Sequence, residues 1–374
     1  MNLLHTFIDS LSWITPFLAV LTILVFLHEL GHYSFARYFG VKIEVFSIGF
    51  GPEIFGWNDK LGTRWKFSLI PLGGYVKMFG DENAASAPDS KALNAMSEED
   101  RKKTLDGKPI WQRVLVVLAG PVANILVTIL LLWVAYIFVG ETSRQSTVGS
   151  IIENSPAYQA GLQPNDKILE INNKKISSFM EAKSIINASP ETQLSMKIDR
   201  DGDVQSLFVT PEKKVLDGIT EIGITGIVPK NVPHTVLSGI SAAINTTYEF
   251  SIEFFKMLGR LIVGGEDSSK LGGLGMIAKM SHDSWVGGIF PLMGFMAMLS
   301  LNLGLINLVP VPMLDGGHIL MYIIEAIRGK PLSEKTMDIA FKIGLGVVLC
   351  LMIYGNWNDI KRYKIIETIL SIFS

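Results

Sequence analysis

The chain has 374 residues, of which 48% are hydrophobic and only 18% charged, and its mean hydropathy is +0.35. A soluble globular protein carries roughly 25% charged residues, so this composition excludes an ordinary soluble protein. The 33 basic residues nearly balance the 35 acidic ones, so no nucleic-acid partner is expected. The single cysteine, Cys350, lies in an apolar run and cannot form an internal disulfide.

Four uncharged runs account for the apolar excess. They have 17, 26, 31 and 16 residues, against the roughly 20 that a helix needs to cross a bilayer core. The shorter two can be extended by neighbouring apolar residues. The sequence therefore predicts four transmembrane helices, over residues 1–36, 111–139, 284–327 and 339–358, followed by a tail over 359–374. The Gly, Asn and Pro content from Asn302 onward predicts that the third helix breaks before it ends.

The basic residues predict the orientation. Residues 1–36 contain no Lys or Arg, whereas basic residues from Arg37 to Arg113 crowd the ends of the loop between the first two spans. Such loops stay on the cytoplasmic side. The N-terminus and the segment between the second and third spans should then lie outside.

Four regions fall between the spans. Residues 37–81 alternate between polar and apolar and contain glycine breakers, which predicts a membrane-associated β-hairpin region. Residues 82–110 are polar and predict a cytoplasmic linker or surface helix. Residues 148–214 predict a small domain of strands with one or two helices. Residues 215–283 predict a linker and a helix whose apolar stripe suits the surface of the lipid bilayer.

An H-E-x-x-H motif occupies residues 28–32, at the end of the first span. On a helix, His28 and His32 project from one face and can bind one Zn²⁺, while Glu29 stands beside them as a general base. A chance match with purely structural histidines is the alternative. It is disfavoured because a carboxylate at membrane depth costs about 2.5–3.5 kcal/mol and is functional by default.

Catalytic zinc usually takes three protein ligands, so a third is required. Asp315 and His318 are the candidates at comparable depth, just after Pro310 and Pro312. The two prolines prevent a regular helix there, and the freed backbone groups must face protein or water, as in a polar cavity. Chemistry alone leaves the choice between Asp315 and His318 open.

Several motifs together resemble the site-two protease family of intramembrane zinc metallopeptidases, in particular its bacterial regulator-of-sigma-E protease branch. The resemblance is carried by the zinc motif, by 307–316 (Asn-Leu-Val-Pro-Val-Pro-Met-Leu-Asp-Gly) and by the segments 49–52, 71–78, 120–124 and 300–304. It implies a bacterial inner-membrane zinc endopeptidase with its active site toward the cytoplasm. The implied substrates are single-span membrane proteins, such as pre-cleaved anti-sigma factors or signal-peptide remnants.

The resemblance also implies roles for individual residues. Asp315 rather than His318 becomes the third zinc ligand, and Glu29 the general base. Asn124, Asn302 and Asn307 become polar groups at the substrate cleft, although an asparagine in a membrane helix also commonly joins helices.

A substrate helix hides its carbonyl groups in internal hydrogen bonds, so it must unwind before cleavage. A strand edge near Gly74 and Tyr75 could hold the unwound segment extended.

The outer domain resembles a bacterial PDZ domain through residues 148–157, 160–168 and 171–172. Such domains commonly bind peptide ends on a sheet edge. A small β domain that only obstructs access to the membrane site is the alternative. The whole protein has two alternatives as well: an inactive membrane adaptor built on the PDZ domain, and a proton-coupled transporter that uses Glu29 and Asp315 as a relay.

Overall fold

The structure is a computed structural model that describes residues 3–81, 95–216, 220–265 and 272–363. The predicted linker and the predicted tail therefore lie partly outside the described residues. The chain divides into two compact units, one of residues 1–132 with 243–358 and one of residues 133–242 with 359–374. Each unit is described by itself.

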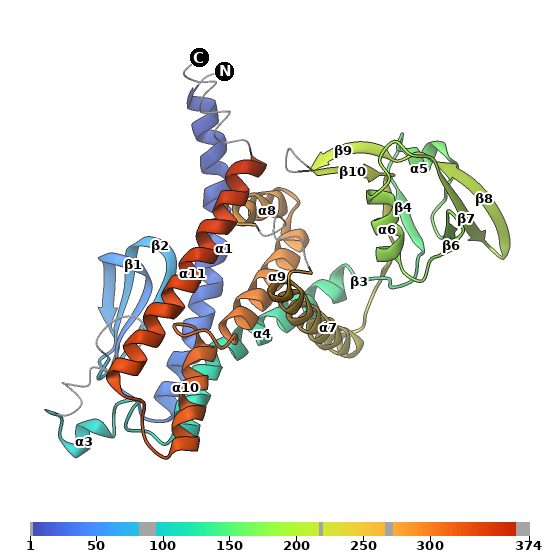
Figure 1. Cartoon of the computed structure of the whole chain (residues 1–374). Coiled ribbons are helices and arrows are strands. Elements are labelled where there is room, and N and C mark those ends of the chain that lie inside the picture. Colours follow the sequence, from blue (N-terminus) through green and yellow to red (C-terminus); the bar gives the residue numbers. More distant parts are fainter. Residues whose placement is uncertain (1–2, 82–94, 217–219, 266–271, 364–374) are drawn as a thin grey trace. The chain divides into compact units, whose positions relative to one another are not determined.

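Among the described residues, four long apolar helices confirm the predicted number of spans: α1 (Leu3–Tyr38), α4 (Ile110–Phe138), α9 (Ile289–Asn307) and α11 (Glu334–Arg362) (Figure 1). Their candidate membrane segments are Ser12–Tyr38, Ile110–Phe138, Ile289–Asn307 and Lys335–Arg362. The protein is a multi-pass membrane protein. Two shorter helices, α3 (Glu98–Arg101) and α8 (Leu274–Val286), also lie in the first unit.

The third predicted span differs in detail from its sequence-based outline. The interval 284–327 begins in the end of α8, contains all of α9 and continues into a separate helix, α10 (Asp315–Arg328). Helix α9 ends at Asn307, so the break falls within the stretch from Asn302 onward whose Gly, Asn and Pro content predicted it. The prolines explain its position, since Pro310 disfavours helical backbone at the residue before it and its ring clashes with the preceding turn.

The β region consists of two long strands, β1 (Ile43–Asn58) and β2 (Arg64–Met78), which pair with each other. Phe46 lies opposite both Val76 and Trp65, so the first half of β1 lies between the two ends of β2. The sheet packs on α1 (Figure 1). A cluster of buried side chains joins them: Ala36, Val41, Ile43, Phe46, Val76, Met78, Leu105 and Val116.

The second unit is rich in β structure. Its main sheet has the order β6–β5–β7–β8, from β5 (Lys167–Ile171), β6 (Lys174–Lys175), β7 (Leu194–Arg200) and β8 (Asp203–Val209). Helices α5 (Pro156–Gln159) and α6 (Phe179–Asn187) accompany it. The core is aliphatic and includes Val148, Ile168, Ile171, Leu194, Met196 and Ile198, all fully buried.

This β-rich domain extends beyond residue 214, where the sequence prediction ended it. Strand β9 (Glu212–Leu216) pairs with β10 (Thr220–Ile224), and β11 (Ile227–Pro229) pairs with β4 (Val148–Ile151) near the domain's start. A last pair joins β12 (Asn231–Val232) to β3 (Glu141–Thr142). Strands β11 and β12 are too short for their alternation to be recognised in the sequence, because a strand of two or three residues carries no period.

Helix α7 (Val236–Val263) occupies the stretch predicted to be helical within 215–283. Its apolar side chains are exposed along much of its length, among them Leu237, Ile240, Ile244 and Tyr248. Contact of this face with the bilayer stays a prediction.

Candidate metal centre

The H-E-x-x-H residues lie on α1, where a spacing of four places both histidines on one face. His28 and His32 are buried, and their Nε2 atoms are 3.1 Å apart. Two ring nitrogens at this distance can share one ion. The helix thus supplies two of the donors that zinc requires.

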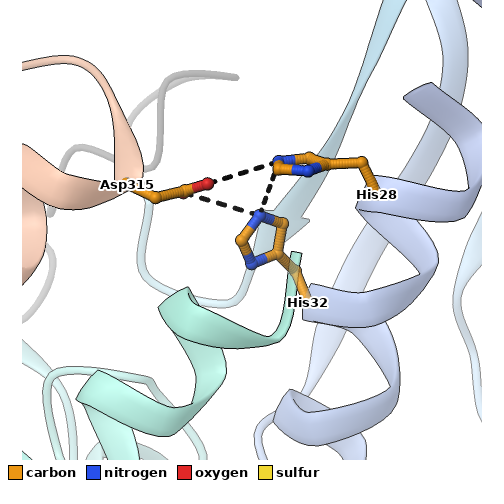
Figure 2. A group of neighbouring side chains, drawn as sticks. All are labelled: His28, His32 and Asp315. Atoms are coloured by element: carbon orange, nitrogen blue, oxygen red, sulfur yellow. Dashed lines mark hydrogen bonds and ion pairs between the residues drawn. The ribbon is translucent and has the colours of Figure 1, made fainter. Parts of the chain in front are cut away.

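Asp315 completes the cluster as the first residue of α10. Its Oδ2 is 3.3 Å from His28 Nε2 and its Oδ1 is 3.5 Å from His32 Nε2 (Figure 2). Oδ2 is buried and has no hydrogen-bond partner in the described part of the chain. One carboxylate and two imidazoles converging on one point, with a carboxylate oxygen unsatisfied, fit a catalytic zinc site with an open fourth position.

The structure thereby distinguishes Asp315 from His318. The ligand atoms of His28, His32 and Asp315 all lie within 4.8 Å of one another, and His318 is not in this group. His318 lies three residues after Asp315 in the first turn of α10 and contacts the ring of Phe341. It still lines the same cavity.

Close packing around two glycines brings the ligands together. A Cβ at Gly120 on α4 would collide with the rings of His28 and His32. A Cβ at Gly316 would collide with the backbone of Leu308 and Val309, so the first turn of α10 could not approach the preceding bend. Just before α10, Met313 has φ +84°, a left-handed conformation that is strained for this residue and is typical of functional sites.

The outer nitrogens of both histidines also have neighbours. His32 Nδ1 lies 2.9 Å from the carbonyl oxygen of Val116, which accepts a hydrogen bond only from a protonated Nδ1. This interaction leaves the lone pair on Nε2, as zinc binding demands. His28 Nδ1 is 3.1 Å from the amide nitrogen of Asn124.

A cavity of about 280 Å³ opens beside the cluster. Glu29 lines it together with Gly74 and Val76 of β2, and a Cβ at Gly74 would lie 3.6 Å from the Glu29 side chain. The base candidate is thus held between its own helix and the strand. The cavity lining includes Val25, Gly73, Gly74, Tyr75, Leu303, Asn307 and Tyr322.

The five residues predicted to bind substrate divide into two groups. Gly74, Tyr75 and Asn307 line the cavity, and the Asn307 amide is 3.4 Å from His28 Nε2. Asn124 is fully buried and Asn302 is half-buried, and neither is among the lining residues.

An ion pair between the buried Arg113 and the half-buried Glu325, which has no signal in the sequence, joins α4 to α10. The Arg113 guanidinium donates to both oxygens of Glu325, at 2.6 and 3.1 Å, and lies 5.0 Å from the ring centre of Tyr322. Removing one partner of such a pair leaves an uncompensated buried charge. Arg113 was counted only as a signal for orientation, because pairing across 212 positions leaves no sequence pattern.

Comparisons with known proteins agree with this geometry. Residues 16–351 match the model of a family described as peptidase family M50. The chain is 39% identical, over 94% of its length and 96% of the relative's, to a protein of Agrobacterium fabrum that is named as a zinc metalloprotease. It is 34% identical to the metalloprotease MmpA of Caulobacter vibrioides, over 98% of this chain and 100% of that protein. A solved PDZ domain from Listeria monocytogenes covers 24% of the chain at 21% identity, with a TM-score of 0.20.

Proposed function

Because the chain belongs to peptidase family M50, we propose that it hydrolyses peptide bonds within the membrane-spanning segments of single-span proteins. The observation that carries this proposal is a zinc-type ligand cluster and an adjacent Glu29 on helices that are long and apolar enough to cross a membrane. An idle adaptor would not need these groups, and a proton-coupled transporter would not need the zinc ligand geometry. A peptidase uses all of them.

The finer assignment is to the regulator-of-sigma-E protease type, in the bacterial inner membrane. The motifs at 28–32 and 307–316 support it, together with the predicted outer domain. The proposed substrates are pre-cleaved anti-sigma factors and signal-peptide remnants. The excess of basic residues between the first two spans supports an active site that opens toward the cytoplasm and a PDZ domain on the periplasmic side.

The proposed chemistry assigns one task to each group. His28, His32 and Asp315 would hold zinc, which when bound would polarise the scissile carbonyl and make a water more acidic. Glu29 takes the proton from that water and passes it to the leaving amine. Asn307, on the cavity wall beside His28, is placed to donate its amide to the substrate backbone.

Strand β2 lies beside the cavity and supports the proposal that the protein holds its substrate in an extended conformation. Residues 74–78 pair with β1 on one side, and β1 is their only partner among the described strands. Residues 73–76 line the cavity. An unwound substrate segment can add to such an edge as a further strand and so expose its carbonyl groups to the site.

The outer domain has two proposed roles. A PDZ domain would bind peptide ends on a sheet edge, whereas a plain obstacle would only exclude substrates with bulky outer domains. Deleting residues 144–230 tests whether the domain restricts the access of substrates or is needed for the fold of the rest of the protein. If the domain only obstructs access, cleavage of untrimmed substrates should then appear, and a loss of all cleavage would contradict that role.

The test of the proposed function is cleavage of a single-span model substrate by the purified full chain in vesicles. We expect cuts inside the hydrophobic segment, located by mass spectrometry, and about one zinc ion per chain. A zinc chelator should abolish cleavage, and added zinc should restore it. Cuts only outside the hydrophobic segment, or activity that survives complete zinc removal, would contradict the proposal.

The strand edge is tested with Tyr75→Pro, which distorts the strand and removes one backbone donor. Cleavage of a stable poly-Leu span should fall at least about tenfold, whereas a span containing Gly and Pro, which unwinds more easily, should lose less. Lys60→Pro, in the exposed turn between β1 and β2, is the matched control and should leave cleavage unchanged. Equal losses for both substrates would contradict the edge model, and a loss of zinc would indicate damage to the site itself.

A further inference from the structure

Asn124 lies in the middle of α4, where it is fully buried next to the proposed zinc ligand His28. Its amide nitrogen is 3.1 Å from His28 Nδ1. Its amide oxygen is buried and has no hydrogen-bond partner among the described residues. A buried unsatisfied oxygen costs roughly 1–3 kcal/mol, so this arrangement calls for a physical reason.

The identity of the amide atom that faces Nδ1 determines which nitrogen of His28 carries the proton. If the amide nitrogen donates, Nδ1 must hold the lone pair, and neutral His28 then carries its proton on Nε2. Nε2 is the atom that points at His32 and Asp315. That tautomer can donate to Asp315 but cannot bind a metal through Nε2.

A half-turn of the Asn124 side-chain amide exchanges its oxygen and nitrogen and so favours the other tautomer of His28. The amide oxygen would then face Nδ1 at the same place, accept its proton in a hydrogen bond, and leave the Nε2 lone pair free. The same turn would give the orphaned oxygen a donor and would move the amide nitrogen to the place that the oxygen now occupies. The two amide orientations therefore correspond to a metal-free and a metal-binding tautomer of His28.

The rest of Asn124 is fixed, so only the amide can respond. The hydroxyls of Thr128 and Ser300 both donate to its backbone carbonyl, at 2.9 and 3.0 Å. Thr128 also lies 3.1 Å from the carbonyl of Ala297, which ties α4 to α9 at this level. A Cβ at Gly304 would come within 3.1 Å of the Asn124 Cβ, so the two helices are in close contact here.

We propose that Asn124 is a positioning residue of the zinc site: its amide oxygen accepts the Nδ1 proton of His28 and so presents Nε2 to the metal. This replaces its predicted role at the substrate cleft. The proposal rests on the zinc site of the proposed function and not on any substrate. It gives His28 the same kind of support that the Val116 carbonyl gives His32.

Two substitutions that introduce side chains of similar size separate the effect of the amide oxygen from the effect of side-chain packing. Asn124→Asp keeps an acceptor at this place, whereas Asn124→Leu keeps the volume without one. Mutation of a residue that hydrogen-bonds to a ligating histidine typically lowers metal affinity 10- to 100-fold. In the full chain in detergent, zinc affinity measured by chelator competition should fall by that factor in Asn124→Leu and by less than about threefold in Asn124→Asp. Asn245→Leu, at an exposed position of α7, is the control and should not change it.

A spectroscopic measurement on the wild-type chain does not depend on how any variant folds. The ¹⁵N shifts of the His28 ring should report a protonated Nδ1 in the zinc-loaded protein and a protonated Nε2 in the zinc-free protein. Equal zinc affinity in all three variants, equal weakening in the Asp and Leu variants, or an unprotonated Nδ1 with zinc bound would each overturn the proposal. Failure of the wild-type chain to bind zinc would instead overturn the metal site and the proposed function with it.

Discussion

Glu29→Gln is expected to abolish cleavage while leaving zinc content and fold intact. Glutamine keeps the size of the side chain and can still face the cavity, but it cannot take a proton from water. General acid–base catalysis contributes about 10²- to 10⁴-fold to a rate, and we expect a loss of at least that size. Single-turnover cleavage of a model span, with zinc measured on the same sample, tests this expectation.

A control glutamate separates the chemistry of Glu29 from a general effect of charge. Glu44 on β1 pairs with Lys77 at 3.2 Å on the same sheet and is half-buried. Glu44→Gln should change cleavage by less than about twofold. Full activity in Glu29→Gln would remove Glu29 as the base, whereas lost zinc would mean that its carboxylate supports the ligands instead.

The pair of zinc-binding histidines on α1 could be predicted from the sequence because the geometry of the pair is local. A spacing of four on a helix fixes the relation of His28 to His32 wherever that helix lies. The four spans could be predicted for a similar reason, since a bilayer imposes a minimum length on each uncharged run. Both predictions needed no knowledge of distant contacts.

The contacts that hold the site together could not be predicted in this way. The interaction of Asn124 with His28 joins positions 96 apart, and that of Arg113 with Glu325 joins positions 212 apart. A Gly at position 120, four residues before Asn124, was visible in the sequence, but its purpose depends on which helix packs against it. The late strands of the outer domain were missed because β11 finds its partner, β4, at the other end of the domain.

The largest effect on the metal itself is expected from Asp315→Asn. The change removes the only anionic ligand of the cluster and leaves a neutral amide oxygen, which is a poorer donor for zinc. We expect zinc affinity to fall by more than the roughly 100-fold that outer partners of ligands cause, so that the protein loses zinc during gel filtration. His318→Ala should retain about one zinc per chain, since His318 lies outside the ligand cluster.

The comparison of these two variants decides the choice that chemistry alone left open. Both residues lie in the first turn of α10 and both line the cavity, so a general disturbance of that turn would affect them alike. Only the replacement of a residue that binds zinc directly should lower the zinc content of one variant and not of the other. If His318→Ala lost zinc as readily as Asp315→Asn, then His318 would have to approach the metal in the loaded protein, through a rotation of α10 about its axis. Such a rotation would strain the Arg113–Glu325 pair, so Glu325→Gln would then change zinc affinity in the chain that keeps His318.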